Sequence, residues 1–322
     1  MIRIRTGDNH PEMKKKRNVW VFGATGFIGS ALVRHLAEDK GNHLHLLLHK
    51  NTPYREFEAH HTISGGLEGL EPHWFRRFPP EVIYHLARPA GSNWISRSVA
   101  AHRGMKLNEK IIRLLAGLPR PPVVVYVSGS LMYGHRVTGE PAPEDASLAP
   151  VSFARHYFQA EKPWLKARES QGLDIRFARP GWIVGPGSWF RRFFWDHYRT
   201  TGKVPCYGDG SQMMSLVHLD DCASMIDALG RYGRKGQNLN VFSGEALTQH
   251  AFSEMLAGIL EAEMKFIPID RIRRMYGLTT ARALLSSIPL ATHYRDIHLR
   301  AGIRHADGKE ILLDVIRLLK NE

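Results

Sequence analysis

The first half of the chain alternates between short apolar runs and segments in which apolar residues recur at helical spacing. The runs have the length and β-branched content of buried strands, and they lie at Asn18–Phe22, His43–His49, Val82–Ala87, Val123–Ser128 and Asp174–Ala178. Helical spacing is found at Ser30–Glu38, at Lys106–Leu118 and at Ser152–Ser170, where Pro163 is expected to interrupt the helix. Strands that alternate with helices predict an α/β fold with a doubly wound parallel sheet.

The regular alternation of apolar runs with helical spacing ends after residue 180. Glycine, proline and tryptophan are dense between Gly181 and Gly210, and Val217–Gly230 begins as a strand and continues as a helix. Two further helices are expected at Thr248–Glu261 and Lys309–Lys320. With 322 residues, the chain is long enough for one large domain or two closely joined ones.

A glycine-rich turn, Gly23-Ala-Thr-Gly26-Phe-Ile-Gly29, joins the first strand to the first helix. The first glycine permits a tight turn, the second lets the backbone approach a pyrophosphate, and the third lets helix and strand pack closely. The free N–H groups at the start of the helix favour the phosphates. Because this turn opens a βαβ unit, it predicts a Rossmann-type domain that binds a nicotinamide dinucleotide.

The end of the second strand bears on which dinucleotide is bound. An acidic residue there would accept a hydrogen bond from the ribose 2′-hydroxyl of NAD. This strand ends with His49 and Lys50, and the nearest acid, Asp39, precedes the strand. The cationic pair favours the 2′-phosphate of NADP, although NAD stays possible if Lys50 is only solvated.

Several segments together resemble the extended short-chain dehydrogenase/reductase family, the NAD-dependent epimerase/dehydratase group. Besides the glycine turn, the resemblance rests on four segments in chain order: His85-Leu86-Ala87, Ser128-Gly-Ser-Leu-Met-Tyr133-Gly134, Arg179-Pro180-Gly-Trp-Ile-Val-Gly185-Pro186-Gly187, and Gly208-Asp209-Gly210 with Val217-His218-Leu219-Asp220-Asp221. They are similar to that family's HLAA, SSxxVYG, RPxxVYGPG and GDG…HVDD segments. The resemblance implies a Rossmann domain, a smaller C-terminal substrate domain and a small-molecule substrate, often a nucleotide sugar.

These implications give domain boundaries and a cofactor site. We expect a basic, disordered tail at 1–17, a dinucleotide-binding domain at 18–180 that 217–243 complete, and a smaller substrate-binding domain formed by 181–216 and 244–322. Met13 reads like a translation start, so 1–12 are expected to be disordered or misassigned. The expected cofactor-binding residues are Gly23, Thr25, Gly26, Phe27, Ile28, Gly29, His49, Lys50, Leu86, Ala87, Ser128, Tyr157 and Pro180. Helix-mediated dimerisation is common in the resembled family, so a homodimer is also expected.

The catalytic pattern of the resembled family is substituted in this chain. That family uses a Ser or Thr, a Tyr that exchanges a proton with the substrate oxygen, and a Lys four residues later, in the pattern YxxxKxxxE. Aligned on Glu161, the three positions hold Gly129, Phe153 and Tyr157. If Tyr157 is instead taken as the catalytic Tyr, Lys162 comes one residue too late, which is a rotation of about 100° on a helix.

Three interpretations follow from these substitutions. The favoured one is an atypical ketoreductase in which Tyr157 and Ser130 donate or orient the proton and the cofactor carries the hydride chemistry. The second is a protein that binds the cofactor without turnover. The third is a nucleotide-sugar epimerase or dehydratase with shifted catalytic residues, which is weakened because Met213-Met214-Ser215 stands where the family often has a phosphate-binding Arg.

Composition and charge bear on the class of partner, on the cellular location and on metal binding. The net charge of +13 allows nucleic-acid binding, but no known motif concentrates that charge, so no nucleic-acid partner is expected. No apolar run is long enough for a membrane helix, and the two cysteines form no disulfide framework, so we expect a cytoplasmic protein. The eighteen histidines show no metal-binding spacing, and no metal is expected.

We also expect a role for several residues outside these motifs. His85 is expected to be a hydrogen-bonded structural histidine, and Asp221 to cap a helix. Arg88 stands where the resembled family prefers a small residue, and it contacts cofactor, substrate or solvent. An aromatic–basic stretch at 182–195 either lines a pocket for a flat substrate or packs into the core.

Overall fold

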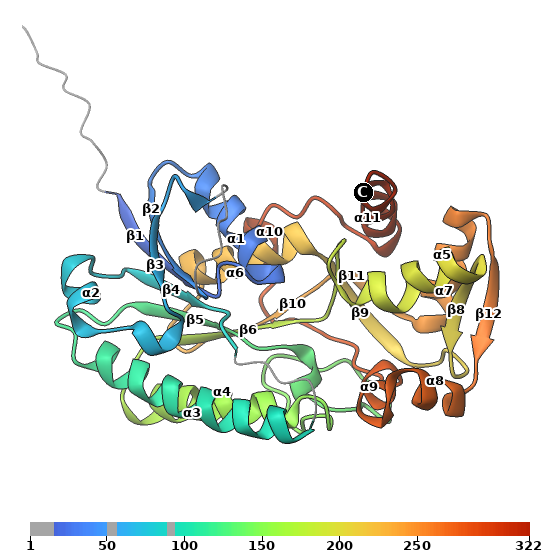
Figure 1. The fold of residues 1–322 in the computed structure, drawn as a ribbon, viewed down its shortest axis with the longest axis horizontal. Helices are drawn as coiled ribbons and strands as arrows, with labels where there is room; N and C mark the ends of the chain where they lie inside the picture. The colour runs from blue at the N-terminus through green and yellow to red at the C-terminus, as the bar shows by residue number, and fades with distance from the viewer. Residues whose placement is uncertain (1–15, 50–56, 89–93) are drawn as a thin grey trace, which may run out of the picture.

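Seven parallel strands form the central sheet of the computed structural model, which describes residues 16–49, 57–88 and 94–322 (Figure 1). Their order is β10-β6-β5-β4-β1-β2-β3. The strands are β1 (Arg17–Phe22), β2 (Asn42–Leu48), β3 (His61–Ser64), β4 (Val82–His85), β5 (Val123–Val127), β6 (Ile175–Pro180) and β10 (Asn238–Val241). The order reverses between β1 and β4, so the crevice for a ligand lies at the carboxyl ends of these two strands.

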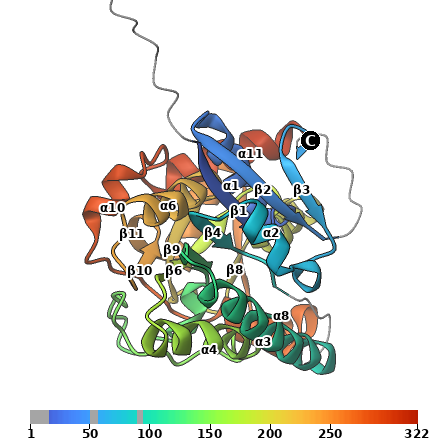
Figure 2. The same ribbon diagram turned by 90° about the vertical axis from the view of Figure 1, so that its left-hand side faces the viewer.

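Helices cover both faces of this sheet. On one face, α1 (Phe27–Glu38) packs beside α6 (Leu219–Tyr232) over a buried aliphatic cluster. On the other face lie α2 (Pro72–Arg77), α3 (Trp94–Ala116) and α4 (Arg155–Ser170), and Figure 2 shows α3 and α4 running side by side. A parallel sheet buried on both faces confirms the predicted fold class, a Rossmann-type doubly wound α/β fold.

Two elements from the C-terminal half of the chain, β10 and α6, pack together with the central sheet. Strand β10 pairs with β6 in parallel, with Leu239 opposite Ala178. Helix α6 contributes Cys222, Met225 and Ile226 to the cluster that α1 also covers. The sheet of the N-terminal half is therefore finished by residues from the C-terminal half, while the division into domains stays a prediction.

The remaining elements surround a second apolar cluster, on the right in Figure 1. It contains a three-stranded sheet of β7 (Trp182–Val184), β9 (Met213–His218) and β11 (Ser243–Thr248), and a pair of strands, β8 (Lys203–Tyr207) and β12 (Glu263–Ile267). The helices are α5 (Asp196–Thr201), α7 (Gln249–Leu260), α8 (Ile269–Tyr276), α9 (Leu278–Leu284) and α11 (Gly308–Lys320). Helix α10 (Arg295–Arg300) is the exception, because it packs against α6 and its Ile297 belongs to the first cluster. Phe190, Phe194 and Phe252 lie at its centre.

Two helices differ from the expected ones. Helix α4 continues through Pro163 without a break, because Ala160, Trp164 and Ala167 on both sides of the proline are buried against the sheet. Helix α3 begins at Trp94, well before the expected start at Lys106. Its first half mixes apolar residues such as Val99 and Ala100 with arginines, serines and a histidine, so it shows a weaker apolar spacing than the second half. No helix in the described ranges is both long enough and apolar enough to cross a bilayer. The expected tail lies mostly at 1–15, outside the described residues.

Candidate functional site

The glycine turn has a geometry that only glycine satisfies. Gly23 has a φ of +87°, and the Gly26 N–H donates to the Gly23 carbonyl oxygen at 3.0 Å. A Cβ on Gly29 would lie 2.0 Å from that same oxygen, and a Cβ on Gly23 would lie 2.8 Å from the Ala87 nitrogen. Gly26 precedes α1 and supplies no side-chain cap, so the first N–H groups of the helix stay available. This cradle fits the pyrophosphate of a dinucleotide.

The other motif residues of the turn connect it to the segment after β6. Thr25, Phe27 and Ile28 are half-buried at the start of α1. The Phe27 ring packs against Gly185 and Gly187, since a Cβ on either glycine would lie 3.2–3.4 Å from ring atoms. Pro180 is the buried last residue of β6, opposite Val241. The two glycine-containing motifs, far apart in sequence, therefore meet at one edge of the sheet.

A cavity of about 930 Å³ opens at the carboxyl ends of β1, β2 and β4. Its walls include Gly23, His49, Gly66, Glu68, Ala87, Arg88, Val99 and Arg103. His49 is exposed at the end of β2, and the Glu68 carboxylate is paired with the Arg103 guanidinium. Leu86 and Ala87, just beyond β4, are half-buried. Lys50, the other residue expected at the ribose, lies outside the described residues.

Glu161 is fully buried behind the end of β5. Its carboxylate accepts a hydrogen bond from the Ser128 hydroxyl and pairs with Arg179, whose Nη2 lies 3.0 Å from Oε1. Two of the segments that carry the family resemblance, those with Ser128 and Arg179, thus meet at Glu161 in one buried network. Because the Ser128 hydroxyl donates its proton to Glu161, it can only accept a hydrogen bond from a ligand.

The residues at the catalytic positions lie around the start of α4. Phe153 stands in the turn before the helix, Tyr157 is in its first turn, and their ring centroids are 5.8 Å apart. The Arg88 guanidinium lies 5.4 Å from the Tyr157 ring centroid and also donates to the Ser128 carbonyl oxygen at 2.6 Å. A Cβ on Gly129 would meet no atom within 4 Å. The positions that the sequence alignment expects for the triad therefore carry a phenyl ring, a phenol and open space.

Ser130 and Lys162, the two further catalytic candidates, lie less favourably for catalysis than Tyr157. Ser130 is buried, 5% exposed, at the start of a 3-10 turn, Ser130–Met132, that follows β5. Lys162, which the alternative alignment would bring to Tyr157, instead extends over the Phe158 ring, 5.5 Å from its centroid. The structure therefore does not bring a lysine to Tyr157 along the helix.

His218, not Asp221, caps α6. The His218 Nδ1 accepts a hydrogen bond from the Asp220 N–H at 3.2 Å. The buried Asp221 carboxylate accepts instead from the backbone N–H groups of Arg304 and His305, at 2.9 and 3.0 Å. The expected cap at Asp221 is wrong, because a segment remote in sequence offers this carboxylate two unpaired N–H donors.

Other residues singled out in the sequence have structural roles. The His85 Nε2 lies 2.9 Å from the Asn108 Oδ1, and burial lowers the pKa of His85 to about 4, so it is a neutral structural histidine as expected. Met214 is buried in the second apolar cluster, together with most of the aromatic stretch, namely Phe190, Phe193, Phe194 and Trp195. Core packing thus accounts for most of that stretch. Both cysteines are buried free thiols.

Comparison with known proteins agrees with these motifs. A model of the NAD-dependent epimerase/dehydratase family matches residues 19–242. The UDP-glucose 4-epimerase of Mycolicibacterium smegmatis is 27% identical over 298 residues, which cover 84% of this chain and 92% of that protein.

Two solved structures show the same fold. One is the UDP-glucuronic acid 4-epimerase of Bacillus cereus in complex with UDP-glucuronic acid and NAD, with a TM-score of 0.73 and 16% identity over 94% of this chain and 99% of that one. The other is the human epimerase family protein SDR39U1 (isoform 2) with NADPH, with a TM-score of 0.73 and 20% identity over 95% of this chain and 100% of that one.

Proposed function

Because this chain belongs to the NAD-dependent epimerase/dehydratase family, we propose that it binds a nicotinamide dinucleotide and acts as an atypical oxidoreductase on a small carbonyl or hydroxyl compound. One observation carries the proposal. The Gly23–Gly29 cradle, in which a Cβ at Gly29 would fall 2.0 Å from a carbonyl oxygen, opens beside a cavity of about 930 Å³ at the topological switch point of the sheet.

Within this proposal, NADP is the preferred cofactor. Among the described residues, the end of β2, where the adenosine ribose is held in this fold, presents the exposed His49 and no carboxylate. The carboxylate that does line the cavity, Glu68, is paired with Arg103. Basic groups at this end attract the additional phosphate of NADP. The human relative carries NADPH, whereas that of Bacillus cereus carries NAD.

Fluorescence titration tests this preference. NADPH should bind at least about tenfold more tightly than NADH, a difference of about 1.4 kcal/mol. His49→Asp should reverse the preference, because a carboxylate repels the 2′-phosphate and accepts from a 2′-hydroxyl. Absence of binding by either nucleotide at millimolar concentration would refute the dinucleotide site itself.

Tyr157 is the proposed proton donor or orienting group. It is half-buried, and it lines a pocket together with Ala87 and Arg88, next to the cofactor cavity. When bound, the nicotinamide ring supplies or accepts the hydride, so the chain has to position the substrate oxygen and manage its proton. The Arg88 guanidinium lies 5.4 Å from the Tyr157 ring centroid and brings a positive charge to this residue. Ser130, the second candidate, is buried and would need a local movement to reach a substrate.

A panel of carbonyl compounds with NADPH tests turnover, and Tyr157→Phe tests the role of the hydroxyl. Loss of a general acid lowers kcat by about 10²- to 10⁴-fold, and the affinity for NADPH, measured separately, reports the expected contact of Tyr157 with the cofactor. Tyr198→Phe, a change of the same kind in α5, is the matched control and should leave kcat unchanged. Tight NADPH binding without turnover of any compound would favour a cofactor-binding protein instead.

A nucleotide sugar is the second candidate substrate. The favouring observation is a cavity of about 650 Å³ between residues 135–139, 208–213 and 285–287, which is large enough for part of such a molecule. The relative from Bacillus cereus binds UDP-glucuronic acid. Met213, which lines this cavity, provides no cation for a diphosphate, and Arg136 is the guanidinium in its wall. Calorimetry with UDP-glucose and with UDP therefore separates the two candidates, because the ketoreductase interpretation expects neither to bind at micromolar concentration.

The surface of α3 and α4 is the proposed contact of a homodimer, since these two helices lie side by side on one face of the sheet. Sedimentation equilibrium tests this expectation.

A further inference from the structure

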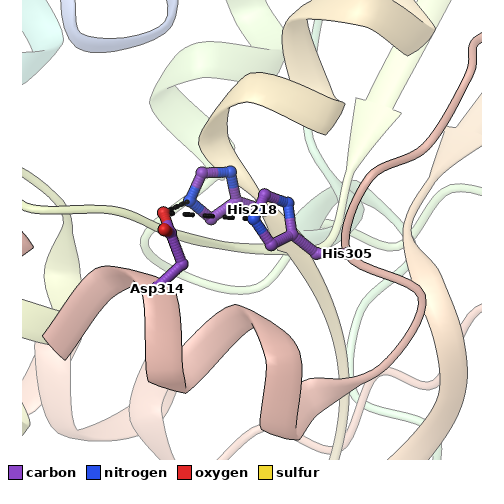
Figure 3. Close-up of side chains that lie close together, drawn as sticks. All are labelled: His218, His305 and Asp314. Carbon is purple, nitrogen blue, oxygen red and sulfur yellow. Dashed lines mark ion pairs between the residues drawn. The ribbon is translucent and has the colours of Figure 1, made fainter. Parts of the chain in front are cut away.

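Three potential metal ligands meet near the C-terminal helix, on a different side of α6 from the central sheet. They are His218 at the end of β9, His305 in the segment between α10 and α11, and Asp314 on α11 (Figure 3). One ligand atom from each residue lies within 4.8 Å of the other two. The Asp314 Oδ2 is 3.3 Å from the His218 Nε2 and 3.9 Å from the His305 Nε2.

The His218 ring presents an unsatisfied nitrogen to this cluster. Its side chain is 2% exposed, and its Nε2 is buried without a hydrogen-bond partner, although the Asp314 carboxylate faces it. A buried polar atom without a hydrogen bond is uncommon in folded proteins. Figure 3 shows that the ring edge with this nitrogen points toward Asp314.

His305 is held in the tautomer that a metal ligand needs. Its Nδ1 lies 2.9 Å from the Oδ2 of the buried Asp221, which also accepts the His305 backbone N–H. A carboxylate at this distance keeps the proton on Nδ1, so in neutral His305 the Nε2 lone pair is free on the side of Asp314. Metal-binding histidines usually have such a carboxylate behind the coordinating ring.

We propose that His218, His305 and Asp314 form a binding site for a divalent transition-metal ion, with Zn²⁺ as the reference ion. Two imidazole nitrogens and one carboxylate oxygen are ligands that Zn²⁺ prefers, and water completes a tetrahedral shell. Bonds of about 2.0–2.2 Å place tetrahedral ligand atoms about 3.3–3.6 Å apart. The 3.3 Å between Asp314 and His218 already fits, whereas the 3.9 Å between Asp314 and His305 and the gap between the two histidine nitrogens, within 4.8 Å, have to close. Asp314 and His305 are 23% and 16% exposed, which leaves an entry path.

Metal binding through the His218 Nε2 costs free energy, because it changes the tautomer of the ring. Its Nδ1 now accepts the Asp220 N–H, so the neutral ring carries its proton on Nε2. Coordination through Nε2 moves this proton to Nδ1 and removes the helix cap. A helix cap is worth roughly a factor of five in an equilibrium constant, so its loss would weaken metal binding by about that factor.

The position of the site indicates a structural role. The ion would join α11 to the start of α6. The next residue, Leu219, contacts Gly185, which in turn contacts the Phe27 ring beside the glycine turn. The site lies outside the cofactor cavity, so this inference does not depend on the proposed reaction.

The test uses the full, untagged chain after treatment with a chelator. Addition of Co²⁺ should produce the visible absorption of a tetrahedral ion with micromolar affinity, and Zn²⁺ should displace it and raise Tm. His305→Gln and Asp314→Asn should each weaken the Co²⁺ affinity at least about tenfold, the order of effect expected for loss of a metal ligand or its partner. Both residues are partly exposed, so either variant provides the answer if the other fails to fold.

His293→Gln is the matched control. His293 pairs with Asp145 at 3.2 Å on the surface, which is also a histidine–carboxylate contact but has no third ligand. The control should bind Co²⁺ like the unaltered chain. The site would be refuted if no tetrahedral spectrum forms at submillimolar Co²⁺, or if His305→Gln binds Co²⁺ as tightly as the control does.

Discussion

The Glu161 carboxylate and the Arg179 guanidinium form an ion pair of 3.0 Å in which the two side chains are 0% and 2% exposed. This pair fixes how α4 is aligned with β6, because a shift of one residue would rotate Glu161 away from its partner by about 100°. We therefore keep Glu161 as the reference for the proposed alignment, in which Phe153 and Tyr157 stand at the positions of the family's Tyr and Lys.

Glu161→Ala should destabilise the fold by about 3–5 kcal/mol, because it leaves the Arg179 charge buried without a partner. Glu161→Gln keeps the shape and a hydrogen-bond acceptor, so it should cost less. Urea unfolding at neutral pH measures both. If Glu161→Ala costs less than about 1 kcal/mol, the pair does not hold the helix in place.

Gly29→Ala should weaken NADPH binding at least about tenfold, or about 1.4 kcal/mol, because the new Cβ forces Gly23 and the start of α1 to separate. Gly258→Ala is the matched control, since Gly258 is an exposed glycine in α7 with open space around its Cβ position. It should raise stability by about 0.5–1 kcal/mol and leave NADPH binding unchanged. Equal effects of the two substitutions would contradict the cradle.

Restoration of the triad is possible without steric conflict at Gly129, where a Cβ meets open space. The variant Gly129→Ser, Phe153→Tyr, Tyr157→Lys should gain NADPH-dependent reduction of a simple ketone, by about 10²-fold or more if general acid catalysis is the missing element. The same variant with Phe153 retained is the control and should show no gain. A triple variant that folds, binds NADPH and remains inactive would contradict the alignment.

Stability should fall as the pH decreases from 6.5 toward 4. Burial lowers the pKa of His85 from 6.5 to about 4, so below pH 6.5 the unfolded chain takes up a proton that the folded state refuses. This residue alone removes about 3 kcal/mol of stability by pH 4. Burial near His43 and His61 lowers the pKa of His45 to about 4 as well, which adds to the effect.

Urea unfolding across this pH range measures the effect. His85→Gln keeps a donor for the Asn108 oxygen and cannot be protonated, so its stability should depend less on pH. Substitution of the exposed His102 by Gln should leave the pH dependence unchanged. An identical slope for His85→Gln and the unaltered chain would show that His85 is not buried as a neutral ring.

Most of the parallel sheet could be predicted from the sequence because its strands are buried on both faces and therefore appear as apolar runs. The exceptions have a physical reason. In β3, only Ile63 is fully buried among exposed and half-exposed residues, so this edge strand carries no apolar run. The start of α3 was missed because its mixture of apolar and polar residues gives only a weak helical periodicity.

The cofactor cradle was determined by the sequence itself, since the glycine turn acts through contacts within a few residues: Gly29 is required by the oxygen of Gly23. The substitutions at Gly129, Phe153 and Tyr157 could be read in the same way, from local motifs. Only the tertiary structure decided which residues meet across the fold. Asp221 holds residues 304 and 305, and His218, His305 and Asp314 come from three separate segments. Spacing along a chain cannot reveal such a cluster, because the packing of α11 against the second apolar cluster brings its members together.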